Sequence, residues 1–326
     1  MADTTVTSTS PSSPTIHGFF ETQTSTWQYL VVDPTTSIAA IIDPVLDFDR
    51  ETQTVSTTTA DALLAFIASN NYTISHILET HIHADHLTAA SYLQTRLTQT
   101  QTESSRPPIC AGKRIEQVQT LFATRYSIPT VEHQTAFDKL FDDDETFRIG
   151  NLEAVAIHLP GHTPDHLGYH IGDNIFCGDS VFHPDIGTAR CDFPGGSAES
   201  LYHSGKRLLA MDPETKIWVG HDYPPAERGE EVPYMTVREH REHNKHLREG
   251  VEKDEFVRLR RERDQKLGEP RLLHPSLQIN VRGGRMPAPA SATLREGVEG
   301  EQPSTSTSTS PNSWNHYPIQ PNPLPI

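Results

Sequence analysis

The chain has 326 residues, with 43 acidic side chains against 27 lysines and arginines and a formal net charge of −16. This length can bury a full core in one large domain or two small ones. The acidity argues against nucleic acid as a partner, because phosphate binding requires a basic face, and we attribute it to solubility.

Cysteine usage and the first residues indicate the compartment. Cys110, Cys177 and Cys191 are widely spaced and odd in number, so they do not form a disulfide framework, and a reducing compartment is expected. No apolar run of the sequence reaches the length of a membrane span. The first residues lack the basic, apolar or arginine-rich features of a signal or presequence. We therefore predict a cytoplasmic protein without membrane contact.

The first part of the chain predicts the order β-β-α-β. Residues 1–15 are rich in Ser, Thr and Pro and are expected to be a disordered tail. Apolar runs at 27–32 and 38–42 flank a polar turn and predict a hairpin. A helix at 62–69 follows, and residues 74–79 then predict a buried strand.

The segment after this strand carries four metal-capable side chains within six residues. His81 and His83 are two apart, so in extended chain they point the same way. A turn can aim Asp85 and His86 back at the same point, before a helix predicted at 87–97. The segment thus forms a strand-to-helix loop, where α/β folds keep their chemistry. Imidazole with carboxylate favours zinc or iron(II) over calcium or magnesium, so we predict a metal site.

A pattern of apolar run, glycine and metal-capable residue occurs three times later in the chain. His162 follows a predicted strand at 152–159, and Asp179 and His221 follow two shorter apolar runs. Because each lies at the end of a strand, we expect the four loops to build one metal centre at one edge of a sheet sandwich. Surface histidines placed by chance would not show this arrangement.

The last third of the chain predicts a cap and a tail. Residues 237–266 are helical and highly charged, which suits an exposed cap. We interpret its three histidines, His240, His243 and His246, as a solvated face. The predicted domain is a catalytic domain over 16–285 with the helical cap from about 235, in which 272–281 is one more strand or a docking segment. Residues 286–326 are expected to be a Ser/Thr/Pro-rich tail that docks, if at all, near its end.

Two further helices are predicted in the middle of the chain, at 115–126 and 198–210.

With these clusters assembled, the chain resembles the metallo-β-lactamase superfamily over roughly residues 16–285. The resemblance implies an α/β fold, an αββα sandwich of two face-to-face mixed β-sheets flanked by helices, with metal at one edge. The residues that carry it are Thr80-His81-x-His83-x-Asp85-His86, Gly161-His162-Thr163, Gly178-Asp179 and Gly220-His221.

Two branches of the superfamily compete. Glyoxalase II, a thioesterase acting on acylated glutathione, is similar in all four motifs. The persulfide dioxygenases share these motifs and resemble the chain further in Gly187–Phe193, Ser200–Ser204 and His221–Pro224. The chain differs from them at Cys191, where the dioxygenases usually carry threonine.

As a persulfide dioxygenase, the chain would hold one iron(II) through His81, His162 and Asp179. This set of two imidazoles and one carboxylate leaves open positions where a persulfide and O2 meet. The resemblance implies that glutathione persulfide, or a similar small persulfide, is oxidised to sulfite. Zinc has no accessible redox change and could not support this reaction. The residues that would orient the ligands and order water are His83, Asp85, His86 and His221.

As a glyoxalase II-like hydrolase, the chain would instead hold two zinc ions that share an activated water. The first ion would take His81, His83 and His162, the second Asp85, His86 and His221, and Asp179 would bridge them. In both interpretations we assign Asp85, His86 and Asp179 to catalysis. A non-catalytic metal-binding interaction protein is the third hypothesis, disfavoured because buried polar ligands cost stability unless they hold a functional metal.

The substrate side of the site is assigned to Arg190, Cys191 and Tyr223. The guanidinium of Arg190 suits a glutathione carboxylate, although an ion pair with Asp192 is the alternative. The expected partners are a small thiol or persulfide and O2, with neither nucleic acid nor membrane. The sequence is compatible with a homodimer.

Overall fold

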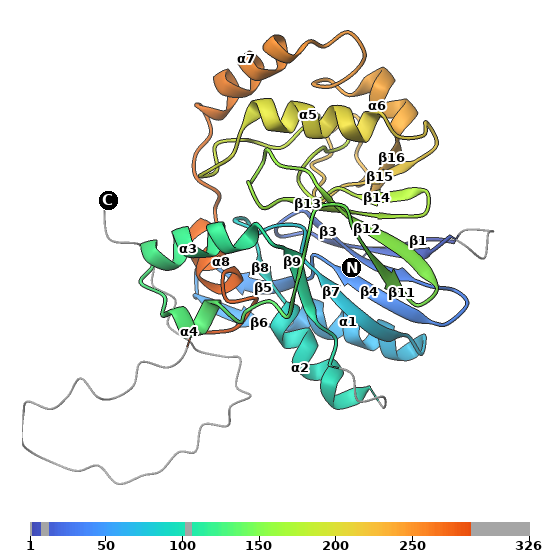
Figure 1. Cartoon of the computed structure of the whole chain (residues 1–326), viewed down its shortest axis with the longest axis vertical. Coiled ribbons are helices and arrows are strands. Elements are labelled where there is room, and N and C mark those ends of the chain that lie inside the picture. Colours follow the sequence, from blue (N-terminus) through green and yellow to red (C-terminus); the bar gives the residue numbers. More distant parts are fainter. Residues whose placement is uncertain (1, 8–12, 102–105, 288–326) are drawn as a thin grey trace, which may run out of the picture.

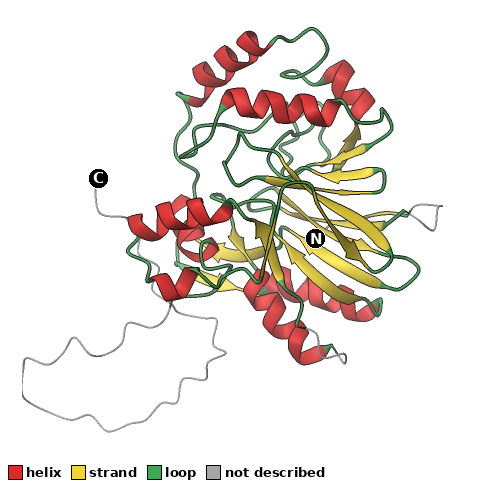
Figure 2. Cartoon of the chain, in the orientation of Figure 1, coloured by secondary structure: helices red, strands yellow, loops and turns green. Residues whose placement is uncertain are grey.

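The protein forms two β-sheets packed face to face, with helices on their outer faces (Figure 1). This computed structural model describes residues 2–7, 13–101 and 106–287. The layered arrangement confirms the predicted αββα sandwich (Figure 2). Within the described residues, none of the helices is long and apolar enough to cross a membrane.

The first sheet has seven strands in the order β1-β2-β3-β4-β7-β9-β10. Strands β1 to β4 pair antiparallel, and β4, β7, β9 and β10 pair parallel, so the sheet is mixed. Strand β3 is buried along its whole length, as expected of a strand covered on both faces. The bounds are β1 Ala2–Val6, β2 Thr15–Glu21, β3 Thr26–Val32, β4 Ile38–Ile42, β7 Thr73–Leu78, β9 Ile109–Gly112 and β10 Lys139–Phe141.

The second sheet has six strands in chain order from β11 to β16. All neighbours pair antiparallel except β14 and β15, which are parallel. A small third sheet, β6-β5-β8, lies beside the metal-site loops. The bounds are β5 Val45–Asp49, β6 Thr54–Ser56, β8 Leu87–Thr88, β11 Glu145–Ile149, β12 Leu152–His158, β13 Leu167–Ile171, β14 Asn174–Phe176, β15 Lys216–Trp218 and β16 Tyr234–Thr236.

Helices cover both sheets and one end of the sandwich. Helices α1 and α2 pack on the first sheet, and α5, α6 and α7 lie over the second, while α3, α4 and α8 gather at one end (Figure 1). The bounds are α1 Thr58–Ser69, α2 Ala90–Thr100, α3 Ile115–Arg125, α4 Thr130–His133, α5 Ala198–Leu209, α6 Val237–His243, α7 Lys253–Asp264 and α8 Leu273–Asn280.

Aromatic side chains fill the space between the sheets. The ring centroid of Trp218 lies 5.5 Å from that of Tyr29 and 5.7 Å from that of Phe176, and all three side chains are buried. The Tyr29 hydroxyl donates to the Val219 carbonyl at 2.6 Å, which satisfies its only polar group. Burying each such ring stabilises the fold by roughly 1.5–3 kcal/mol, and these contacts fix the edge where the metal-site loops leave the strands.

The structure differs from the sequence-based expectations in four segments. Residues 87–88 form strand β8, so the helix predicted at 87–97 begins only at Ala90 and runs to Thr100. Ala2–Val6 pairs antiparallel with β2 instead of forming part of a disordered tail. Residues 273–280 form helix α8 rather than a strand. In the cap, His240 and His246 are buried instead of solvated, and His243 alone of the three is exposed. The expectations for residues 288–326 lie outside the described residues.

Candidate metal centre

Four loops converge at one edge of the sandwich, each leaving the end of a strand. His81 follows β7, His162 follows β12, Asp179 follows β14 and His221 follows β15. The turn at Gly178 requires glycine, because its φ is +46° and a Cβ there would lie 2.6 Å from the Thr80 hydroxyl. The glycine in this pattern therefore lets the backbone bring the carboxylate beside the neighbouring loop.

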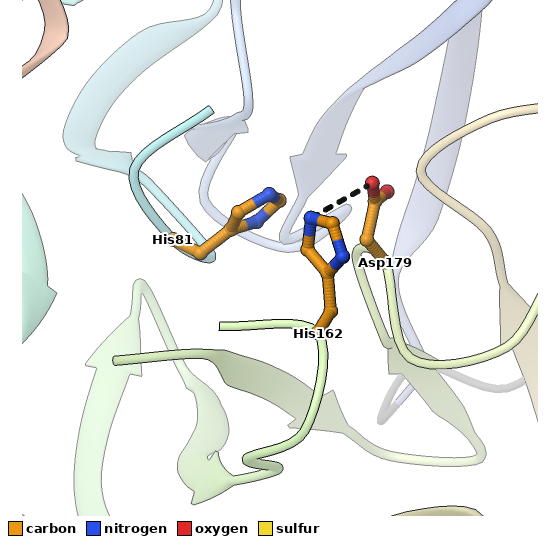
Figure 3. Close-up of side chains that lie close together, drawn as sticks. All are labelled: His81, His162 and Asp179. Atoms are coloured by element: carbon orange, nitrogen blue, oxygen red, sulfur yellow. Dashed lines mark ion pairs between the residues drawn. The ribbon is translucent and has the colours of Figure 1, made fainter. Parts of the chain in front are cut away.

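One group of ligand atoms is formed by His81, His162 and Asp179, which point toward one another (Figure 3). One ligand atom from each lies within 4.8 Å of the others. His162 Nε2 is 3.6 Å from Asp179 Oδ2, and the His81 and His162 rings meet edge to face with centroids 5.1 Å apart. All three side chains are buried, so the group is a compact, largely dehydrated set of two imidazoles and one carboxylate.

Two further groups adjoin this one and extend the centre. His83, Asp85 and His86 form one, and Asp85, Asp179 and His221 form the other. His221 Nε2 lies 3.0 Å from Asp85 Oδ2 and 3.5 Å from Asp179 Oδ1. Asp85 and Asp179 are each shared between groups, so the structure brings all seven predicted ligands into one centre.

Unpartnered nitrogens show that these residues fit a metal. Among the described residues, His81 Nε2, His83 Nδ1 and His86 Nε2 are buried without a hydrogen-bond partner. A buried polar atom left without a partner costs about 1–3 kcal/mol, and an imidazole nitrogen is a preferred ligand of zinc and iron. The free nitrogens therefore match a bound cation.

Neighbouring groups fix which nitrogen of each ring is free. The Thr80 hydroxyl donates to Asp43 Oδ2 at 2.7 Å, so toward His81 it can only accept, from Nδ1 at 2.9 Å. The His162 Nδ1 atom lies 2.7 Å from the carbonyl oxygen of Arg190, which also can only accept. Both rings thus carry their proton on Nδ1 and keep the Nε2 lone pair for the metal.

His83 has the opposite orientation. Its Nε2 lies 3.1 Å from Asp43 Oδ1 and 3.3 Å from Glu79 Oε2, which leaves Nδ1 facing the centre. Burial opposes a positive charge on His83, but the two carboxylates outweigh it and hold the pKa of this imidazole well above its usual value. The pKa of His81 lies well below the usual value because burial and the neighbouring imidazoles disfavour its charged form.

Two supporting residues were not identified from the sequence. Asn280 on α8 donates from Nδ2 to the carbonyls of His83 and His86, both at 2.8 Å, and accepts the Thr88 N–H at 2.9 Å. No local pattern connects it with a loop nearly two hundred residues earlier. The His166 ring stacks on His81 with centroids 4.7 Å apart, and its Nε2 accepts the Asp179 N–H at 2.9 Å. Its position four residues after His162 was the available signal.

A cavity of about 680 Å³ opens onto the metal centre. His162, Asp179, Asp85 and His221 line it from the centre's side. The acidic residues Asp49 and Glu51 and several neutral polar, apolar and cationic side chains line the rest. They include Phe182, Ile186, Leu267, Arg50, Arg190, Arg260, Arg263 and Arg271.

The three predicted substrate residues have different positions. Tyr223 lines the cavity, is half exposed, and stacks on His221 with centroids 5.8 Å apart. Arg190 lines it too, while its Nε and Nη2 each lie 2.5 Å from an oxygen of Asp192, the ion pair weighed as the alternative. Cys191 is not among the lining residues and packs against the apolar cluster beneath α5. Burial raises the pKa of its thiol to about 12, so the structure does not support a substrate contact for Cys191.

The fold and this centre define an enzyme of the metallo-β-lactamase class. The family described as "Metallo-beta-lactamase superfamily" matches residues 22–221, and the chain belongs to it. Members with this site are metal-dependent hydrolases or oxidoreductases, and the chain is an enzyme of this kind.

Two curated relatives and one solved structure are similar to the chain over most of the described fold. The chain is 44% identical to "Glyoxylase B2" of Dictyostelium discoideum over 83% of this chain and 91% of the relative. It is 27% identical to "Hydroxyacylglutathione hydrolase" of Methylococcus capsulatus over 61% of this chain and 62% of that protein. The crystal structure of ETHE1 from Myxococcus xanthus superposes with a TM-score of 0.64 and 26% identity, covering 83% of this chain and 99% of that one.

Proposed function

We propose that the protein is an oxidoreductase of the persulfide dioxygenase type, using one iron(II) per chain to oxidise glutathione persulfide or a similar small persulfide with O2. The observation that carries this proposal is the group of His81, His162 and Asp179, which is complete by itself as a set of two imidazoles and one carboxylate. His162 and Asp179 also line the cavity, so a substrate there reaches the metal position directly. The reaction belongs to sulfur metabolism.

The reaction balances with water as the only other reactant. The sulfur–sulfur bond breaks, and the inner sulfur leaves as the glutathione thiol. The outer sulfur is oxidised to sulfite with both atoms of O2 and the oxygen of one water, O2 is reduced, and the remaining protons pass to solvent. Iron(II) held by these three ligands would supply the redox chemistry that zinc lacks.

Residues that line the cavity would bind and orient the substrate. Five arginines line the cavity beside four acidic residues, Asp49, Glu51, Asp85 and Asp179, so its wall is far less acidic than the chain as a whole, whose net charge is −16. A guanidinium in this wall suits a carboxylate of glutathione. Arg263 and Arg271 have no acidic partner among the described residues, whereas Arg190 and Arg260 are paired with Asp192 and Asp264. Tyr223 and Phe182 form an apolar wall, their rings edge to face at 6.3 Å. Asp85, next to His221, can hold a water or proton beside the sulfur.

A second candidate function rests on a separate observation. The free nitrogens of His83 and His86 lie in a group next to Asp179, where a second metal would fit. A two-zinc centre with a bridging water would suit hydrolysis of glutathione thioesters. The similarity to a hydroxyacylglutathione hydrolase points the same way.

Oxygen consumption separates the two reactions. Protein reconstituted with iron(II) is expected to take up O2 and release sulfite when given glutathione persulfide, and the zinc form is expected to take up none. An oxygen electrode with sulfite detection measures both. If the iron form takes up no O2 but the protein cleaves lactoylglutathione, the thioesterase is correct and the dioxygenase proposal fails.

A further inference from the structure

Helix α7 contains a fully buried ion pair within the charged cap. Arg260 is 0% exposed, and its Nη2 lies 2.7 Å from Oδ1 of Asp264, one helical turn later. Arg258 and Arg261 on the same helix are both about two thirds exposed (66%). Removing an ion from water is unfavourable unless it is paired and hydrogen-bonded. The buried pair therefore needs contacts that the exposed ones do not make.

Those contacts are with the backbone of residues 188–191. Arg260 Nη1 donates to the carbonyl oxygens of Thr188 and Ala189, each at 2.8 Å. Asp264 Oδ2 accepts the N–H of Cys191 at 2.8 Å. The two side chains thus hold the backbone on both sides of Arg190.

Two residues that follow helix α6 in the cap bind the start of the same segment, residues 187–188. Asn244 Nδ2 donates to the Gly187 carbonyl at 3.1 Å, and His246 Nδ1 accepts the Thr188 N–H at 3.0 Å. A Cβ on Gly187 would lie 2.2 Å from the His246 ring, so the two segments are in close contact. Together with the backbone of residues 181–183, the cap therefore holds residues 187–191.

The residue in the middle of this segment touches a metal ligand. The carbonyl of Arg190 accepts the Nδ1–H of His162 at 2.7 Å. This hydrogen bond sets the tautomer of His162 and aims its Nε2 toward Asp179, 3.6 Å away. The Arg190 side chain, on the same residue, lines the cavity.

We propose that Arg260 and Asp264 are positioning residues for the metal ligand His162. By clamping the backbone around Arg190, they fix the carbonyl that orients the imidazole and keeps its Nε2 free. The C-terminal cap is thereby part of the metal site rather than a covering. This inference goes beyond the proposed function and holds for either reaction, because His162 binds metal in both.

Metal affinity tests the clamp without reference to turnover. The test variant is Arg260→Met, and the matched control is Arg258→Met, which removes an exposed pair with Glu262 from the same helix. Zinc affinity is measured by competition with a chromophoric chelator, and site geometry by the absorption bands of the cobalt(II) form. Arg260→Met is expected to bind zinc about 10–100-fold more weakly, the usual effect of losing a group that orients a ligand, with shifted cobalt bands. Arg258→Met should match wild type.

The conservative change Arg260→Lys keeps the charge but not the planar fork, and is expected to fall between wild type and Arg260→Met. A folded Arg260→Met protein with wild-type zinc affinity and unchanged cobalt bands would overturn the proposal. If Arg260→Met does not fold, Asp264→Asn decides, because it preserves shape while removing a charged acceptor. A weaker zinc affinity supports the clamp, and wild-type affinity refutes it. Neither result depends on whether the persulfide reaction is observed.

Discussion

Substitution of Asn280 by alanine tests whether helix α8 holds the loop that carries His83 and His86. The change removes three buried hydrogen bonds, two to the loop carbonyls and one from the Thr88 N–H. Asn280 is only 2% exposed, so water does not readily replace it. At about 1 kcal/mol for each bond, the expected loss is about 3 kcal/mol in the free energy of unfolding.

Urea unfolding of the metal-free protein measures this loss, with Asn70→Ala as the control. Asn70 is exposed and donates to a carbonyl of its own helix, so its substitution should cost no more than about 0.5 kcal/mol. Because the loop carries candidate ligands, zinc affinity of Asn280→Ala should fall as well. A loss no larger than that of Asn70→Ala would refute the view that α8 supports the metal site.

Four other substitutions test three separate parts of the structure. His81→Ala and Asp179→Ala should each lose metal and activity, since both residues belong to the central group; retained metal with near-normal turnover would contradict the site. His86→Ala should keep one iron per chain and lose activity about 10–100-fold, as measured by metal analysis and O2 uptake, and loss of a metal equivalent would favour the two-metal enzyme. Asp33→Asn should make the free energy of unfolding less sensitive to acid. Burial alone would raise the pKa of Asp33, but hydrogen bonds from Asn151, Thr36 and Thr35 lower this pKa to about 2. Its stabilisation is therefore present above pH ~4 and lost as the pH falls through the folded value, an effect of about 2 kcal/mol. Urea unfolding at pH 5 and pH 2.5 should show a smaller difference for the variant, and an equal difference would contradict the assignment.

Local patterns predicted the approximate course of the strands, and the resemblance to the metallo-β-lactamase superfamily implied the αββα sandwich. The hairpin over 27–42 and the strands before His81 and His162 are apolar runs ended by turns, and the structure has strands at these places. The seven candidate ligands were visible for the same reason, since each lies in a loop after a strand end. Local sequence alone was enough for these features.

Features that depend on distant contacts were not predicted. The alternation of Leu277, Ile279 and Val281 resembles a strand, yet the helix brings Asn280 to the metal-site loop. Arg260 lies among exposed charges in the sequence, but it is buried, paired with Asp264 and bonded to the carbonyls of Thr188 and Ala189. Cys191 follows the cavity residue Arg190 in the chain, but it packs against the apolar cluster beneath α5 and not against the cavity. In each case a partner far away in the sequence decides the environment.

Metal stoichiometry tests the central claim most directly. Metal-free protein is titrated with iron(II) without oxygen, and metal bound per chain is measured after removal of the excess. We expect saturation at about one iron per chain, held by His81, His162 and Asp179, with O2 uptake on persulfide reaching its maximum at the same point. Saturation at two metal ions per chain, with no O2 uptake at either stage, would contradict a single-iron dioxygenase.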